Sequence, residues 1–203
     1  MTERLQLPEW IVEKEPRLGS LEVICGCMFS GKSDELIRRV RRAPFARKNV
    51  LVFKPSVDKR RDPGTVNTYD NAKHPAVSVS SSKEILERIQ EDTDWVAVDE
   101  AQFFDADLPL VCNFLASAGL RVIVAGLDSD FRGEPFGPMD SLMRSADKVD
   151  KQTAHCVICG ATATRTQRIV NEKPANFDDP VVVVGAEESY QARCRLHHEV
   201  RRD

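Results

Sequence analysis

Residues 26–33 read Gly26-Cys27-Met28-Phe29-Ser30-Gly31-Lys32-Ser33, and they match the phosphate-binding loop pattern G-x-x-x-x-G-K-[ST] at every fixed position. An apolar run at 21–25 precedes the loop, and a segment of helical periodicity at 33–42 follows it. The pattern is informative only between a strand and a helix, and both are indicated here. The sequence therefore predicts a nucleotide site in which backbone N–H groups and the helix dipole face phosphate oxygens. In this site Lys32 would contact the terminal phosphates, and the Ser33 hydroxyl would hold Mg²⁺.

Strands and helices alternate along the rest of residues 20–150. Continuous apolar runs, typical of strands covered on both faces, predict strands at 21–25, 49–53, 95–100 and 120–125. Helical patterns predict helices at 33–42, 81–92, 107–118 and 141–149. This alternation predicts an α/β fold of the P-loop, RecA-like kind, with a mostly parallel sheet, flanking helices and right-handed crossovers.

The strand at 95–100 ends in two carboxylates, Asp99 and Glu100. In open α/β sheets, ligands bind at the carboxyl ends of the strands. Downstream of a phosphate loop, such an acidic strand end is typical of a Walker B element, whose aspartate holds Mg²⁺ directly or through water. Taken alone, the pair is better explained as the start of a turn or as a helix cap at Ala101-Gln102. Together with the loop, it favours the site.

Two polar segments flank this core. Residues 56–79 are irregular and polar, which predicts a mobile flap near the phosphates. Arg38, Arg39, Arg41 and Arg42 lie opposite the apolar stripe of the 33–42 helix and are predicted to form a solvated basic face, with phosphate or subunit contacts as the weaker alternative.

The chain has six cysteines, and their spacing divides them into two groups. Cys25, Cys27 and Cys112 lie in apolar surroundings and are predicted to be small buried side chains. C-x-x-C at 156–159 and C-x-x-H at 194–197 suit a closed tetrahedral Zn²⁺ site, structural rather than catalytic. Its ligands would be Cys156, Cys159, Cys194 and His197, with His155 and His198 as alternatives for the fourth position.

Length and charge limit the other possibilities. The 203 residues suffice for one domain and a smaller appendage, predicted as an extension at 1–19, a nucleotide-binding domain at 20–150 and a zinc-binding part at 151–203, which contains β-like runs at 152–155 and 181–184. With 29 basic and 32 acidic residues, the chain has no general attraction to nucleic acid or to an anionic membrane. It shows no apolar run of the roughly 20 residues needed to span a bilayer and no signal peptide, so we expect a soluble, cytoplasmic protein.

Several further stretches carry a family resemblance. They are Phe-Lys-Pro at 53–55, Asp-Glu-Ala-Gln-Phe-Phe at 99–104, Gly-Leu-Asp-Ser-Asp-Phe-Arg-Gly-Glu-Pro-Phe-Gly at 126–137, Thr-Arg-Thr-Gln-Arg at 164–168 and Gly-Ala-Glu-Glu-Ser-Tyr-Gln-Ala-Arg-Cys at 185–194. With the phosphate loop, and in this order, they resemble the thymidine kinase family, in its P-loop, zinc-containing branch. The resemblance covers roughly residues 20–198.

This resemblance implies transfer of the γ-phosphoryl group of ATP to the 5′-hydroxyl of thymidine, giving thymidine monophosphate and ADP. Glu100 matches the catalytic base of the family, and Lys32, Mg²⁺ and Arg60 would stabilise charge on the transferred group. The residues implied to bind ATP or Mg²⁺ are Gly26, Cys27, Met28, Phe29, Ser30, Gly31, Lys32, Ser33, Asp58, Arg60, Asp99, Glu100, Ala101 and Gln102.

The resemblance also implies a nucleoside site formed by Met28, Phe103, Leu127, Phe131, Phe136, Thr166, Val181, Val183, Gly185 and Tyr190. For Leu127, core packing is a serious alternative. Residues 160–190 resemble the lasso segment of the family, whose backbone binds the thymine base and whose ends zinc would anchor. The family further implies a homotetramer inhibited by thymidine triphosphate.

Two features depart from the family pattern. The flap has Thr68-Tyr69-Asp70-Asn71 where many bacterial members have a Ser-His-containing stretch, and His197 stands where a cysteine is common. A nucleic-acid-dependent ATPase is the first alternative, but a helicase motor needs two such domains and a basic surface. A GTPase is the second, but its guanine-reading signature is missing.

Overall fold

The computed structural model describes residues 18–57, 64–67, 73–182 and 189–202. Within these ranges, the main sheet contains β1 (Ser20–Gly26), β2 (Asn49–Pro55), β5 (Val77–Val79), β6 (Thr93–Val98), β7 (Arg121–Leu127) and β8 (Lys148–Gln152). The strands lie in the order β5-β2-β6-β7-β1-β8, and every neighbouring pair is parallel. The predicted parallel α/β sheet is thereby confirmed.

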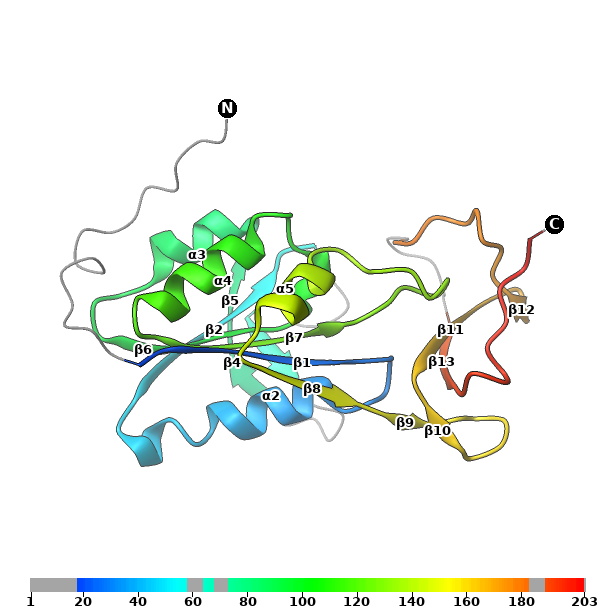
Figure 1. Ribbon diagram of the computed structural model, residues 1–203, viewed down its shortest axis with the longest axis horizontal. Coiled ribbons are helices and arrows are strands. Elements are labelled where there is room, and N and C mark those ends of the chain that lie inside the picture. The colour runs from blue at the N-terminus through cyan, green and yellow to red at the C-terminus, as the bar shows by residue number, and fades with distance from the viewer. Residues whose placement is uncertain (1–17, 58–63, 68–72, 183–188, 203) are drawn as a thin grey trace.

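Helices cover both faces of this sheet (Figure 1). One face carries α2 (Lys32–Val40); the other carries α3 (Ser82–Arg88), α4 (Leu108–Ser117) and α5 (Met139–Ser145). Strand β1 shows why both faces are covered: Leu21 and Val23 are buried with α3, α4 and α5, whereas Ile24 is buried with α2. Alternate side chains of a strand point to opposite faces, so an apolar run needs two cores. Short 3₁₀ turns, η1 (Pro44–Ala46) and η2 (Ala101–Phe103), follow α2 and β6.

A small antiparallel part lies beyond one end of the sheet (Figure 1). It contains β9 (Ala154–His155), β10 (Thr162–Ala163), β11 (Arg165–Val170), β12 (Lys173–Pro174) and β13 (Ser189–Arg193). β9 pairs with β10, and β11 lies between β12 and β13. Among the described residues, no helix is both long and apolar enough to cross a membrane.

Two predictions of local structure are wrong. The helix expected at 141–149 ends at Ser145, and β8 follows it as the edge strand beside β1. The reason is a tertiary contact: the Asp147 carboxylate accepts a hydrogen bond from the backbone N–H of Leu21 at 2.8 Å, which directs the chain into the sheet.

The flap at 56–79 is not irregular throughout, since it contains β3 (Thr65–Asn67), β4 (Lys73–Pro75) and β5. Strands of three residues are too short to leave a clear periodicity.

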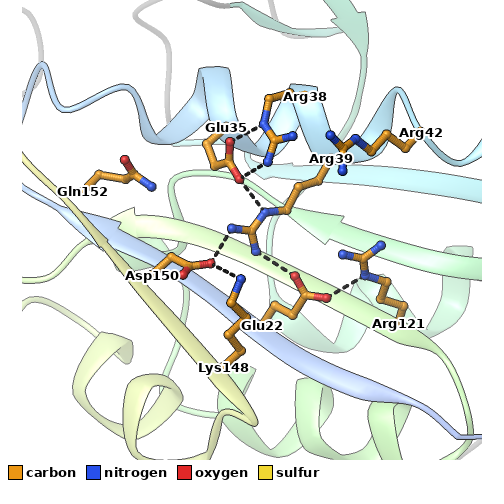
Figure 2. Close-up of a pocket in the computed structure, with 9 residues that line it drawn as sticks. All are labelled: Glu22, Glu35, Arg38, Arg39, Arg42, Arg121, Lys148, Asp150 and Gln152. Atoms are coloured by element: carbon orange, nitrogen blue, oxygen red, sulfur yellow. Dashed lines mark hydrogen bonds and ion pairs between the residues drawn. The ribbon is translucent and has the colours of Figure 1, made fainter.

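Arg39 departs from the predicted solvated basic face of α2 (Figure 2). Its side chain is only 7% exposed, and its three nitrogens contact Glu22 on β1 at 2.7 Å, Glu35 on α2 at 2.8 Å and Asp150 on β8 at 2.5 Å. Carboxylates from three elements thus surround one guanidinium. The cavity beside it has a volume of about 330 Å³ and is lined by Glu22, Glu35, Arg38, Arg39, Arg42, Arg121, Lys148, Asp150 and Gln152.

Candidate active site

The loop at 26–33 leaves β1 at Gly26 and enters α2 at Lys32. Gly26 has φ 140°, and a Cβ there would lie 2.3 Å from the backbone oxygen of Gln152, so only glycine fits between the loop and β8. Gly31 has φ 81°, and Phe29 has φ 64°. Successive turns of this kind, ending at a helix N-terminus, can present several N–H groups to one anion.

Lys32 folds back over its own loop. Its Nζ donates to the backbone oxygen of Cys27 at 2.7 Å, and Ser30 Oγ donates to the same oxygen at 2.8 Å. Burial lowers the pKa of Lys32, and the charges of Glu100 and Asp99 oppose this shift. The ammonium therefore lies where the loop and the acidic end of β6 meet.

Asp99 follows β6 and is bonded to the first helical turn after the loop. Its backbone N–H donates to the backbone oxygen of Phe53 on β2 at 2.9 Å, and this hydrogen bond aligns the ends of β2 and β6. Ser33 Oγ donates to its carboxylate oxygens at 3.2 and 3.1 Å. Burial, together with the neighbouring charge of Glu100, raises the pKa of Asp99 to about 7. A hydroxyl and a carboxylate this close form an oxygen-rich pair of the type that binds Mg²⁺.

Glu100 sits at a strained turn. Its φ of 51° and ψ of 41° place it in the left-handed region, which is costly for a residue with a Cβ. Its carboxylate accepts a hydrogen bond from Gln102 Nε2, and the Gln102 Oε1 accepts from the backbone N–H of Leu127 at 2.9 Å. Because strain of this kind is concentrated at functional sites, the turn marks Glu100 as a candidate.

The small antiparallel part reaches the phosphate loop directly. The backbone N–H of Met28 donates to Thr166 Oγ1 on β11 at 3.0 Å. Burial raises the pKa of Cys27, and its protonated thiol donates to the backbone oxygen of Ala163 at 3.5 Å. The phosphate loop and β11 are thus in direct contact although they are distant in sequence. This contact brings together Met28 and Thr166, both of which are expected in the nucleoside site.

The other expected nucleoside residues fall into two groups. Phe103 and Phe136 are partly buried and pack edge to face, with centroids 5.5 Å apart. Leu127 and Phe131 are buried at 7% and 3% exposure, and Val181 and Tyr190 are partly exposed. The structure brings Phe103 to Phe136 and connects Leu127 to Gln102, and Tyr190 lies on β13 opposite Arg168 of β11.

The ligand atoms of Cys156, Cys159, Cys194 and His197 all lie within 4.8 Å of one another. The Sγ atoms of Cys159 and Cys194 are 3.8 Å apart, and His197 Nδ1 lies 3.3 Å from Cys194 Sγ and 3.7 Å from Cys156 Sγ. Four ligands around Zn²⁺ with Zn–S bonds of about 2.3 Å would have edges of roughly 3.8 Å, so these spacings suit a tetrahedral metal site. Burial acts to raise the pKa of Cys156, but backbone hydrogen bonds from Cys194, Ile158 and Cys159 outweigh it and lower that pKa to about 5.

The alternative histidines are engaged elsewhere. His198 Nε2 lies 2.8 Å from the backbone oxygen of Phe131, and His155 Nδ1 lies 3.2 Å from that of Gly160. His197 is therefore the histidine that joins the three cysteines.

Comparison with known families agrees with this geometry. A sequence model of the family described as thymidine kinase matches residues 19–198. The chain belongs to the thymidine kinase family. Thymidine kinases transfer a phosphoryl group from ATP to thymidine, and this kinase chemistry uses Mg²⁺.

Two arginines of this thymidine kinase were not singled out from the sequence. Arg132 Nη2 donates to the backbone oxygen of Asp179 at 2.6 Å, and Arg168 Nη1 donates to that of Pro180. Both guanidinium groups lie 5.3 Å from the ring centroid of Phe131. They hold residues 179–180 against the loop after β7. The sequence did contain a signal for Arg168. Side chains alternate along a strand, so Arg168 lies on the same side of β11 as Thr166, which is expected in the nucleoside site.

Some expected residues of the thymidine kinase site lie outside the described ranges. These are Asp58 and Arg60 of the flap, its departure at 68–71, and Val183 and Gly185 of the lasso. Of the strand-like run at 181–184, the described residues 181–182 belong to no strand. Cys25, Cys27 and Cys112 are buried, as predicted.

Proposed function

We propose that the phosphate loop, Asp99 and Glu100 form the catalytic centre of this thymidine kinase. The observation that carries the proposal is the contact of Ser33 Oγ with both oxygens of Asp99, made between residues 66 apart in the chain. It joins the start of α2 to the end of β6, where a phosphate-binding loop and an acidic strand end must meet to hold Mg²⁺ and a nucleotide together.

In this proposal the loop binds the phosphates of ATP. The proposed ATP and Mg²⁺ residues are Gly26, Cys27, Met28, Phe29, Ser30, Gly31, Lys32, Ser33, Asp58, Arg60, Asp99, Glu100, Ala101 and Gln102. Lys32 leaves the oxygen of Cys27 for the terminal phosphates. Ser33 and Asp99 would hold Mg²⁺, which when bound would neutralise charge on the transferred group.

Glu100 is the proposed base. Its carboxylate takes the proton of the 5′-hydroxyl as that oxygen bonds to the γ-phosphorus, and the bond from phosphorus to the β–γ bridging oxygen breaks to release ADP. The proximity of Glu100 to Lys32, visible in the effect of its charge on that lysine, supports this arrangement.

The nucleoside site is proposed at Met28, Phe103, Leu127, Phe131, Phe136, Thr166, Val181, Val183, Gly185 and Tyr190. The contact between Met28 and Thr166 and the aromatic pair of Phe103 and Phe136 support it. The bonds of Arg132 and Arg168 to residues 179–180 support a lasso whose backbone meets the thymine base.

The cluster of Cys156, Cys159, Cys194 and His197 is proposed to hold a structural Zn²⁺. The cluster offers four ligand atoms, enough to fill every position around a tetrahedral ion, as structural sites do. We propose the division into residues 1–19, 20–150 and 151–203, a cytoplasmic homotetramer, inhibition by thymidine triphosphate and no nucleic-acid or membrane partner. Family membership and a net charge of −3 support these last points.

The test is ADP release from Mg-ATP with thymidine, deoxycytidine, deoxyguanosine or no nucleoside, in wild-type protein and Glu100→Gln. We expect thymidine-dependent turnover that falls about 10²- to 10⁴-fold in the variant, while the Kd for ATP is unchanged. Glu87→Gln, on the exposed side of α3, is the matched control. Normal turnover by Glu100→Gln would show that another group is the base.

A further inference from the structure

Gln102 lies behind Glu100 and uses both ends of its side-chain amide. It is 2% exposed. Its Oε1 accepts from the backbone N–H of Leu127 at 2.9 Å, and its Nε2 donates to the Glu100 carboxylate. The orientation of the amide is not arbitrary, because a backbone N–H can only donate and must face the oxygen. The other end is therefore the NH₂ group, which suits a carboxylate.

The backbone of two glycines packs closely against Gln102. A Cβ on Gly126 of β7 would lie 2.8 Å from Gln102 Oε1, and a Cβ on Gly137 would lie 2.1 Å from the Gln102 backbone oxygen. Two glycines thus allow β7 and the loop before α5 to close on this residue. The position of Gln102 is set by the sheet rather than by Glu100.

The Glu100 side chain, in contrast, needs an external support. It has three rotatable bonds and starts from a backbone in the left-handed region, at the end of a strand. A carboxylate that must meet one hydroxyl proton loses much of its effect when it is misplaced by about 1 Å, which can cost about 10²-fold in rate. A hydrogen bond from a rigid amide removes this freedom.

We propose that Gln102 is a positioning residue of the kinase reaction. Its amide oxygen is held by the backbone N–H of Leu127 on β7, and its amide nitrogen orients the carboxylate of Glu100 by a hydrogen bond. This inference rests on the proposed role of Glu100 as the base. It differs from the nucleotide contact that the family resemblance implies for Gln102, because the side chain is buried and both ends of its amide already have protein partners.

Two isosteric variants test this role. Gln102→Met removes both hydrogen bonds, and Gln102→Glu, when ionised, keeps an acceptor for Leu127 but places a like charge against Glu100. We expect kcat to fall about 10- to 100-fold in both, with the KM for thymidine and for ATP changed less than about threefold. A rise in the KM for ATP at unchanged kcat would overturn the proposal and support a nucleotide contact.

A matched control separates positioning from folding. Gln167 on β11 is also buried, at 1% exposure, and its amide bonds the backbone of Glu199 on both sides, at 2.8 Å each. Gln167→Met should lower Tm about as much as Gln102→Met while kcat stays within about twofold. An equal loss of kcat in both variants would assign the effect of Gln102 to general destabilisation.

A double-mutant cycle with Glu100→Gln completes the test. If Gln102 acts through Glu100, Gln102→Met should change the residual rate of Glu100→Gln by less than about twofold, as expected for residues that act as one unit. If Gln102→Met lowered the rate of the Glu100→Gln protein as much as it lowers that of the wild-type protein, the proposal would be overturned. If Glu100→Gln itself keeps full kcat, the proposed base is wrong, and this outcome is recognised before Gln102 is varied.

Discussion

Arg39 is the residue whose environment departs most from that of an ordinary helix surface. Its guanidinium bonds carboxylates on β1, α2 and β8 (Figure 2). We expect Arg39→Met to leave three carboxylates facing one another and to lower the free energy of unfolding by about 2 kcal/mol, between the values for exposed and for fully buried pairs. In a chain of this size that lowers Tm by about 4–8 °C.

The control for Arg39 is Arg38→Met. Arg38 contacts only Glu35 of the same cluster, and its side chain is 52% exposed. Its loss should shift Tm by less than about 2 °C. Equal Tm shifts in the two variants, measured by scanning calorimetry, would show that burial of Arg39 adds no stability beyond that of an exposed ion pair.

Glu35 makes the same cluster sensitive to acid. The hydrogen bond from Arg38 lowers the pKa of Glu35 to about 2, in spite of an opposing effect of burial, and Arg39 acts in the same direction. A lowered carboxyl pKa stabilises the fold above the ordinary value of 4.5, and this stabilisation is lost as the pH falls toward about 2.

Urea unfolding between pH 6 and pH 2 tests this effect in wild-type protein and in Glu35→Gln. Since other carboxyl groups also take up protons over this range, the difference between the two proteins is the relevant quantity. We expect this difference to be largest above pH 4.5 and to shrink toward pH 2. A difference independent of pH would contradict the assignment.

At the scale of elements, one side chain connects β11 to the phosphate loop. Thr166 Oγ1 accepts from the backbone N–H of Met28. We expect Thr166→Val to raise the Kd for ATP about fivefold, since an unpaired N–H in the loop costs about 1 kcal/mol. Thr166→Ser keeps the oxygen and should bind ATP normally. Titration calorimetry without nucleoside measures both, and equal affinities would refute the coupling.

Gly126 is the second prediction at this scale. A Cβ at this position of β7 would lie 2.6 Å from the sulfur of Met139 and 2.8 Å from Gln102 Oε1. Gly126→Ala should therefore push α5 or Gln102 away from the sheet and lower Tm, at a cost of about 1–3 kcal/mol for overpacking. A Tm of Gly126→Ala equal to that of the wild-type protein, measured by scanning calorimetry, would contradict this reading of the packing.

The elements that the sequence predicts well are those in which adjacent residues carry the signal. The phosphate loop, the acidic end of β6 and the two halves of the Cys/His cluster each occupy a few consecutive residues. β8 and β5 were missed because their pairing with β1 and β2 overrides a weak local pattern. The bonds of Gln102 and Arg39 could not be predicted, since their partners come from other elements and leave no spacing to recognise.

At the scale of the whole molecule, the Cys/His cluster packs against the loop at 26–33. Cys27 of the loop is buried in one small apolar cluster with Cys156, Cys194 and three alanines, Ala154, Ala163 and Ala192. We expect Cys194→Ser to lose about one zinc per chain, measured by mass spectrometry, and to weaken ATP binding as well. Cys112→Ala removes a buried thiol of α4 and should keep its zinc. Full zinc content in Cys194→Ser would contradict the proposed site.

The connection between β8 and β9 is a single residue, Thr153, because β8 ends at Gln152 and β9 begins at Ala154. Cys27 of the loop after β1 is also buried against the Cys/His cluster, so we expect the sheet and the cluster to move as one rigid body. Fluorescent labels at Leu110, exposed on α4, and at Ala161, exposed beside β10, should therefore report the same energy transfer with and without ATP and thymidine. Substrate capture would then proceed by loop rearrangement over a fixed frame, unlike the closure of two domains.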